Sequence, residues 1–112
     1  MSNAGELHFT LDRAKFFEIG RVLQRNWRTV DLGPVTFNAQ PGKLTIMTSR
    51  GGGEIPCDGT GQVAAELSAS QFRRLITSRF RERAPSGLMK LTFRPEFGEV
   101  AIDVAGVKAR FL

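Results

Sequence analysis

Hydrophobic and polar residues alternate with a period of two in short runs and recur every three to four positions in longer ones, and this succession occurs twice along the chain. Residues 7–11 and 63–67 are short extended runs of the first kind. A potential helix cap follows each run, because the side chains of Asp12 and Ser68 can accept a hydrogen bond from an amide of a helix's first turn. The pattern therefore predicts a strand followed by a helix in each half of the chain.

Both predicted helices have one apolar face. Their apolar residues recur three or four positions apart, as in a helix that packs on a sheet, and the opposite faces are expected to be exposed. The residues of the apolar faces are Phe16, Ile19, Gly20, Leu23 and Trp27 in the first helix and Phe72, Leu75 and Ile76 in the second.

A β-hairpin is predicted after each helix, because two short alternating runs flank turn-forming residues there. Each half then ends in a further short strand, which gives the order strand, helix and three strands twice. The hairpins are residues 35–37 and 44–46 around Pro41-Gly42, and residues 91–93 and 100–102 around Gly98.

Two segments are predicted to form exposed edges of the sheet. Residues 54–56 contain Pro56, which has no amide hydrogen to donate to a neighbouring strand, and the glycines at 51–53 are interpreted as a turn. Residues 107–111 form the last predicted strand. Because edge strands carry unpaired N–H and C=O groups, we expect the chain to form a homo-oligomer through such edges.

The two halves also resemble each other in sequence. A shift of 56 residues aligns 11–46 with 67–102 without a gap, where ordinary residue usage gives about two or three identities. We interpret this as duplication within one domain, residues 5–112, with halves of about 5–60 and 61–112, preceded by a disordered or vector-derived leader at residues 1–4; the alternative is chance similarity of two amphipathic units. The identical pairs are Leu11/Leu67, Phe16/Phe72, Arg25/Arg81, Leu32/Leu88, Thr36/Thr92, Phe37/Phe93, Gly42/Gly98 and Ile46/Ile102.

The segments TLDRAKFFEIG (10–20) and ELSASQFRRLI (66–76), with the hairpins VTFNAQPGKLTIMTS (35–49) and LTFRPEFGEVAIDV (91–104), resemble one domain of a DNA polymerase sliding clamp. The resemblance lies in the order and size of the elements. It implies an α+β fold of two pseudo-symmetric βαβββ units, with antiparallel sheets and two helices on one face. Known clamps string two or three such domains in a chain and are usually acidic, and both differences argue against a role in polymerase processivity.

The charge distribution points to an anionic partner. Lys and Arg number 16 against 11 Asp and Glu, a net charge of +5. Arginines lie opposite the apolar faces of both helices, where they suit the non-specific binding of double-stranded DNA through its phosphates. The alternative is a pair of solvated helix faces. The candidate residues are Arg21, Arg25, Arg28, Arg73, Arg74 and Arg81.

Other chemistry finds little support in the sequence. One His and one Cys cannot supply a zinc site, no motif calls for a cofactor, and no catalytic set emerges, so we expect no enzyme. His8 is expected to face away from the core, Cys57 to be partly buried, and Trp27 to close a core edge. No run approaches the ~20 apolar residues of a membrane span, and the composition suits a reducing compartment, so a cytoplasmic protein is expected.

Two functions remain open at this stage. The first is a clamp-like module that binds the DNA backbone, and the second is a protein-interaction module on the same fold that engages a partner peptide through a pocket or a sheet edge. A small enzyme is the third and weakest hypothesis. One continuous surface formed by the two arginine faces would favour the first of these, whereas faces on opposite sides would favour the second.

Overall fold

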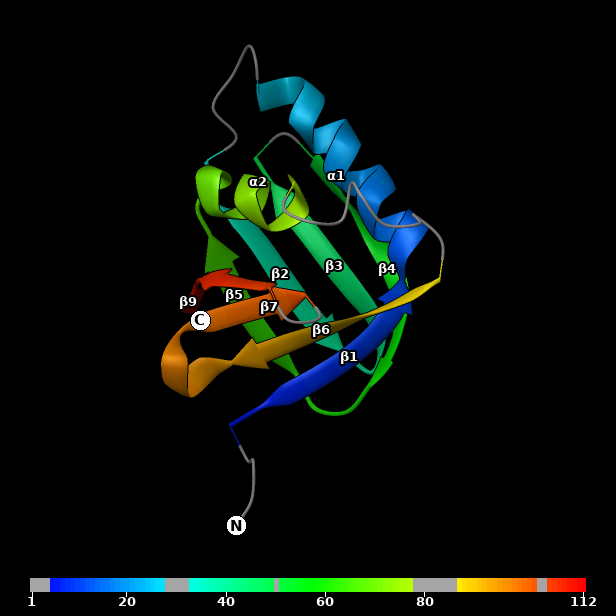
Figure 1. The fold of residues 1–112 in the computed structure, drawn as a ribbon, viewed down its shortest axis with the longest axis vertical. Helices are drawn as coiled ribbons and strands as arrows, with labels where there is room; N and C mark the ends of the chain where they lie inside the picture. Colours follow the sequence, from blue (N-terminus) through cyan, green and yellow to red (C-terminus); the bar gives the residue numbers. More distant parts are fainter. Residues whose placement is uncertain (1–4, 28–32, 50, 78–86, 103–104) are drawn as a thin grey trace.

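The computed structural model describes residues 5–27, 33–49, 51–77, 87–102 and 105–112 (Figure 1). They form a mixed α+β fold of two α-helices and a mostly antiparallel sheet, and this confirms the α+β part of the expected fold class. The elements are β1 (Leu7–Asp12), α1 (Arg13–Trp27), β2 (Val35–Gln40), β3 (Gly42–Thr48), β4 (Gly51–Gly59), β5 (Val63–Leu67), α2 (Ala69–Thr77), β6 (Leu88–Arg94), the short 3₁₀ helix η2 (Pro95–Phe97), β7 (Glu99–Ile102), β8 (Ala105–Lys108) and β9 (Arg110–Phe111).

The strands lie in the order β8-β7-β6-β1-β4-β3-β2-β5-β9, and every pairing between neighbours is antiparallel. The first and last strands of this order, β8 and β9, are separated along the chain by Ala109 alone. The C-terminal run therefore joins the two ends of the sheet. Within this run β8 pairs with β7 and β9 pairs with β5.

The predicted edge strand at residues 54–56 is wrong, because β4 lies inside the sheet between β1 and β3. Along β4 the pairing with β1 begins at Cys57, one residue after Pro56, so the proline lies just outside that ladder. The glycines at 51–53 belong to the strand and not to a turn. A side chain at Gly52 would overlap the carbonyl oxygen of Ile46, so glycine permits the close approach of β3 and β4.

Both helices begin at the predicted caps. The backbone amide of Lys15 donates to Asp12 Oδ1 over 3.2 Å at the start of α1. At the start of α2 the amide of Gln71 donates to Ser68 Oγ over 3.1 Å, and the amide of Ser68 donates to Gln71 Oε1 over 2.9 Å. This reciprocal capping box satisfies two amides that a helix leaves without backbone partners.

The two predicted hairpins are also present, and a glycine with positive φ closes each. Gly42, the first residue of β3, has φ of +95°, and Gly98, between η2 and β7, has φ of +59°. An L-residue with a side chain rarely adopts such angles, which accounts for glycine at both turns.

Four buried phenylalanines form the centre of the core. The ring of Phe37 on β2 lies 6.4 Å from Phe16 of α1, 5.7 Å from Phe72 of α2 and 6.5 Å from Phe93 of β6, measured between centroids. Phe16 and Phe72 are thus buried on the predicted apolar faces. The side chains of Leu23, Trp27 and Ile76 lie outside the described part of the structure, so their predicted positions stay predictions.

Candidate functional site

The two helices lie next to each other, in front of β2, β3 and β4 in Figure 1, and contact each other directly. In addition, α1 packs on β1 and β4, and α2 packs on β5 and β8. The capped starts and the shared phenylalanine core fix this arrangement. The exposed sides of both helices therefore belong to one end of the molecule.

Three of the six predicted arginines are described with their side chains, and all three are exposed. They are Arg21 on α1 and Arg73 and Arg74 on α2. The main chain of Arg25 lies in α1, but its side chain is not among the described ones, and the predictions for Arg28 and Arg81 fall outside the described residues.

The exposed charged side chains described on the two helices are together called the helix face: Lys15, Arg21, Arg73 and Arg74, with Glu18 as the acidic residue among them. Lys15 was not predicted; it lies six residues before Arg21 on α1 and is also exposed. Arg13 is not counted in the helix face; its Nη2 donates to the carbonyl oxygen of Leu88 over 3.2 Å. Guanidinium and ammonium groups so placed can donate hydrogen bonds to phosphate oxygens.

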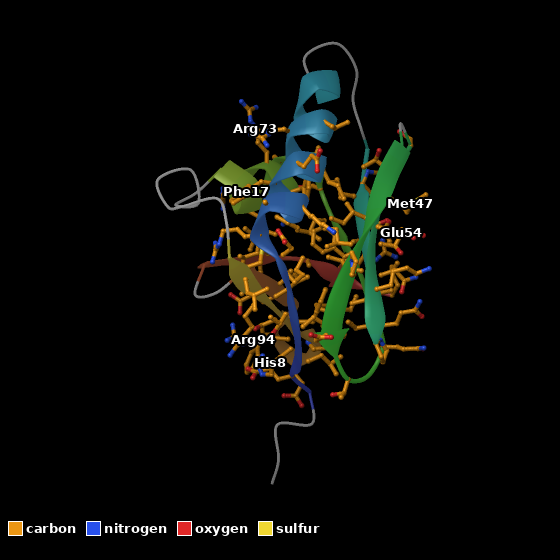
Figure 2. All side chains as sticks on the ribbon, turned by 90° about the vertical axis from the view of Figure 1, so that its right-hand side faces the viewer. His8, Phe17, Met47, Glu54, Arg73 and Arg94 are labelled. Carbon is orange, nitrogen blue, oxygen red and sulfur yellow. The ribbon has the colours of Figure 1, made fainter. Side chains whose placement is uncertain are left out.

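A second polar group, which the sequence analysis missed, joins the start of β1 to β6 (Figure 2). His8 Nε2 lies 3.1 Å from Glu6 Oε1, and His8 Nδ1 lies 3.1 Å from Thr92 Oγ1. Arg94 donates from Nε to Glu6 over 2.8 Å and from Nη1 to Glu99 over 2.9 Å. These residues are up to 93 positions apart (Glu6 to Glu99), so no local pattern could have indicated the cluster.

Glu6, His8 and Thr92 place a carboxylate, an imidazole and a hydroxyl next to one another, as in sites where a hydroxyl is activated as a nucleophile. The position of Thr92 argues against such a role for its hydroxyl. Its side chain is only 2% exposed, so a substrate cannot reach the hydroxyl. The hydrogen bond from Arg94 also holds the pKa of Glu6 below its ordinary value, which makes this carboxylate a weak base. The cluster therefore serves to attach β1 to its neighbours, and His8 is exposed as predicted.

Cys57 is more deeply buried than predicted, with 5% of its surface exposed. Its Sγ donates to the carbonyl oxygen of Gln40 over 3.5 Å. Burial, and secondly the charge of Asp58, raise the pKa of the thiol. Cys57 is thus protonated near neutral pH and unsuited to nucleophilic chemistry.

Within the described ranges, no three His, Cys, Asp or Glu side chains are grouped as a metal site requires. In the same part of the chain, neither helix combines the length and the apolar character that crossing a bilayer demands.

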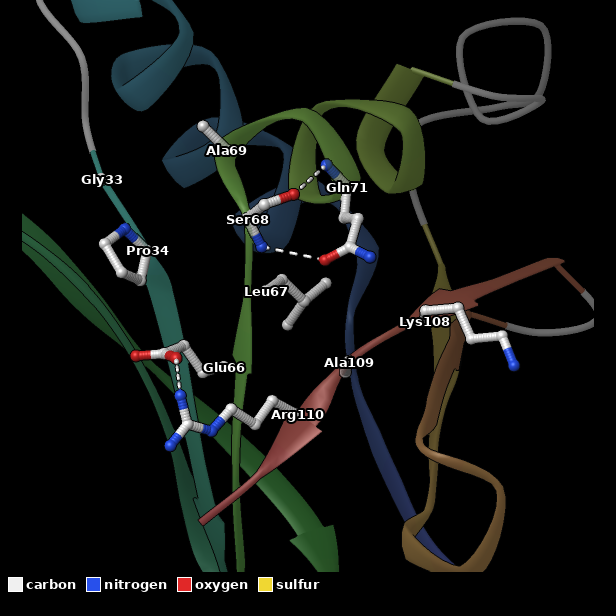
Figure 3. A pocket seen from close by; sticks show the side chains of 10 residues that line it. All are labelled: Gly33, Pro34, Glu66, Leu67, Ser68, Ala69, Gln71, Lys108, Ala109 and Arg110. Atoms are coloured by element: carbon white, nitrogen blue, oxygen red, sulfur yellow. Dashed lines mark hydrogen bonds and ion pairs between the residues drawn. The ribbon is translucent and has the colours of Figure 1, made fainter.

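An open pocket of 510 Å³ lies between the start of α2 and the C-terminal run (Figure 3). Its polar lining comes from Glu66, Ser68 and Gln71 on one side and from Lys108 and Arg110 on the other. The apolar lining is shallow and consists mainly of Pro34, Ala69 and Ala109 beside the buried Leu67.

Comparison with known proteins adds no assignment: no family model matches the chain, and neither curated proteins nor solved structures give a significant match.

Proposed function

We propose that the chain is a non-enzymatic module that binds the backbone of double-stranded DNA non-specifically through the helix face. The observation that carries the proposal is the contact between α1, which contains Arg21, and α2, which contains Arg73 and Arg74. The helix face has four cations against Glu18 alone. Contacts to phosphates supply affinity without reading sequence, so clusters of this kind suit any duplex.

The side-chain chemistry of the helix face favours a duplex over a single strand. Proteins that bind single strands stack bases on exposed aromatic rings. Among the described side chains of α1 and α2, Phe16 and Phe72 are buried and Phe17 is only partly exposed. In the part of the helices whose side chains are described, the helix face thus offers charge without an exposed aromatic ring on which a base could stack.

The proposal extends to a duplicated, clamp-like domain, and the strand pairing supports this part. β1 pairs with β6 as β5 pairs with β2, and β4 pairs with β3 and β1 as the C-terminal run pairs with β7 and β5. The repeated residues Phe37 and Phe93 are both buried and meet in the core. A homo-oligomer would place several helix faces along one duplex.

The test is fluorescence anisotropy on a random duplex at several salt concentrations. Four to six phosphate contacts predict a slope of log K against log salt of roughly −4 to −5, because each contributes about −0.9. The double variant Arg73→Ala/Arg74→Ala should flatten the slope by about 2 units. Binding should be weak and should collapse by about 0.2 M salt.

Lys43→Ala provides the matched control, since Lys43 lies on β3, away from the helices, and pairs with Glu54 over 3.5 Å. It should leave the slope unchanged. Absence of binding in about 50 mM salt, or equal slopes for the wild type and the double variant, would reject DNA binding. Circular dichroism checks that each variant is folded.

The second candidate is a protein-interaction module, which the pocket between α2 and the C-terminal run favours. It differs from the first in location, because its lining residues Gln71, Lys108 and Arg110 do not belong to the helix face. If the chain binds no DNA but does bind a ligand at this pocket, the second candidate is supported.

A further inference from the structure

The pocket between the start of α2 and the C-terminal run presents mostly hydrogen-bond donors. The side-chain oxygen of Gln71, Oε1, accepts from the backbone amide of Ser68. The side-chain nitrogen of Gln71, Nε2, can therefore donate to another group. Figure 3 shows this nitrogen pointing away from Ser68 on the side of Lys108. Lys108 and Arg110 add an ammonium and a guanidinium group, which cannot accept hydrogen bonds.

The acidic residue of the pocket neutralises these cations only in part. Glu66 Oε1 lies 3.8 Å from Arg110 Nη1, and the arginine side chain is 79% exposed. An exposed ion pair of this length contributes little, so Arg110 can turn to another anion at small cost. No partner of Lys108 is found within ion-pair distance in the described ranges. The pocket is therefore complementary to a ligand with carboxylates.

The shape and lining of the pocket favour a peptide over an enclosed small molecule. Small-molecule sites bury most of the ligand among apolar and aromatic groups. This pocket is open, and Pro34, Ala69 and Ala109 provide only a shallow apolar surface. A chain that continues beyond the pocket on both sides gains contacts that a small molecule cannot.

We propose that this pocket binds an acidic peptide segment of a partner protein, whose carboxylates pair with Lys108 and Arg110 and accept from Gln71. The site is separate from the helix face. It goes beyond the DNA-binding proposal, and either one can fail alone.

The experiment is an NMR titration of the ¹⁵N-labelled full chain with a blocked hexapeptide of alternating alanine and glutamate. Chemical-shift changes should concentrate on the amides of residues 66–71 and 108–110, with a Kd on the order of 1 mM or below. The same peptide with glutamine in place of glutamate should bind at least tenfold more weakly. Sodium acetate at equal carboxylate concentration should cause no comparable shifts.

The double variant Lys108→Gln/Arg110→Gln should lower the affinity for the acidic peptide at least tenfold. Its matched control, Lys43→Gln, removes a cation elsewhere on the sheet and should leave the affinity unchanged. Lys108→Gln alone, at an exposed position, tests the site if the double variant does not fold. Arg73→Ala/Arg74→Ala should keep peptide binding, which separates this result from the DNA test.

Four results would overturn the proposal: no shifts, shifts confined to the helix face, equal binding of the glutamine peptide, or an affinity that Lys108→Gln/Arg110→Gln leaves unchanged. Acetate that binds as tightly as the peptide would replace the peptide site with a site for free anions.

Discussion

Arg94 binds two carboxylates at once, Glu6 immediately before β1 and Glu99 at the start of β7. The hydrogen bond from Arg94 is the main reason why the pKa of Glu6 lies below its ordinary value, and the neighbouring His8 acts in the same direction. The same hydrogen bonds raise the pKa of Arg94. One guanidinium group therefore attaches the N-terminal strand to the β6–β7 hairpin.

This arrangement predicts a loss of stability in acid. A carboxylate whose pKa is lowered by folding stabilises the fold above its unfolded pKa, near 4.5, and loses that contribution as the pH falls through the lower folded value. Glu6→Gln should therefore reduce the urea midpoint at pH 7 and make the change between pH 7 and pH 3 smaller than in the wild type. Glu54→Gln, at a more exposed ion pair, serves as the control. An identical acid dependence for Glu6→Gln and the wild type would contradict the prediction.

At the residue scale, what could be predicted from the sequence depended on how local the interaction is. The caps Asp12 and Ser68 act on amides three positions away, and both were found as predicted. The partners of His8 include Thr92, 84 positions away, and nothing near His8 in the sequence indicates that residue. The exposed arginines were recognisable because helical periodicity assigns a face to each position.

At the element scale, the order of strands and helices followed from alternation and turn residues, whereas the neighbours of each strand did not. Pro56 was interpreted as the mark of an edge, yet β4 pairs on both sides. Its ladder with β1 involves only Cys57, Asp58 and Gly59, so a short pairing leaves room for proline. Packing over the whole chain decides which strands lie beside β4. A local sequence pattern carries no information about these neighbours.

The edge strands also decide how the chain can self-associate. With β4 inside the sheet, the remaining ends of the strand order are β8 and β9. Lys108 and Arg110 lie on this run and would meet the same cations of a second copy, so we expect a weak dimer that salt strengthens by screening.

Sedimentation equilibrium from micromolar to millimolar concentration should show a mass that rises above the 12.4 kDa of one chain. The dimer fraction should increase with salt, opposite to the expected change in DNA binding. A 12.4 kDa species alone, at every concentration and salt condition, would reject the homo-oligomer.

At the scale of the whole molecule, the two halves share one core. Phe37 of the first half contacts Phe72 and Phe93 of the second, and β1 lies between β4 of its own half and β6 of the other. Neither half can bury its apolar surface without the other. We therefore expect the chain to unfold in a single cooperative transition.

Phe37→Ala tests this coupling, because it removes a fully buried ring from contacts with both helices. The loss should be about 3–5 kcal/mol of unfolding free energy, the usual range for truncating a buried phenylalanine. Met47→Ala is the control on the adjacent strand, since Met47 is 49% exposed, and it should change stability by about 0.5 kcal/mol or less. Phe37→Leu, a smaller truncation, applies if Phe37→Ala does not fold.

Two probes report on the two halves: the fluorescence of Trp27, the one tryptophan, in α1, and hydrogen exchange of amides in β5 and β6. If the core is shared, Phe37→Ala lowers the denaturant midpoint equally for both probes. A midpoint that shifts for Trp27 and stays constant for β6 would mean that the halves unfold separately. Such a result would also remove the basis for treating the two helices as one rigid surface, because their relative position depends on the rings that meet at Phe37.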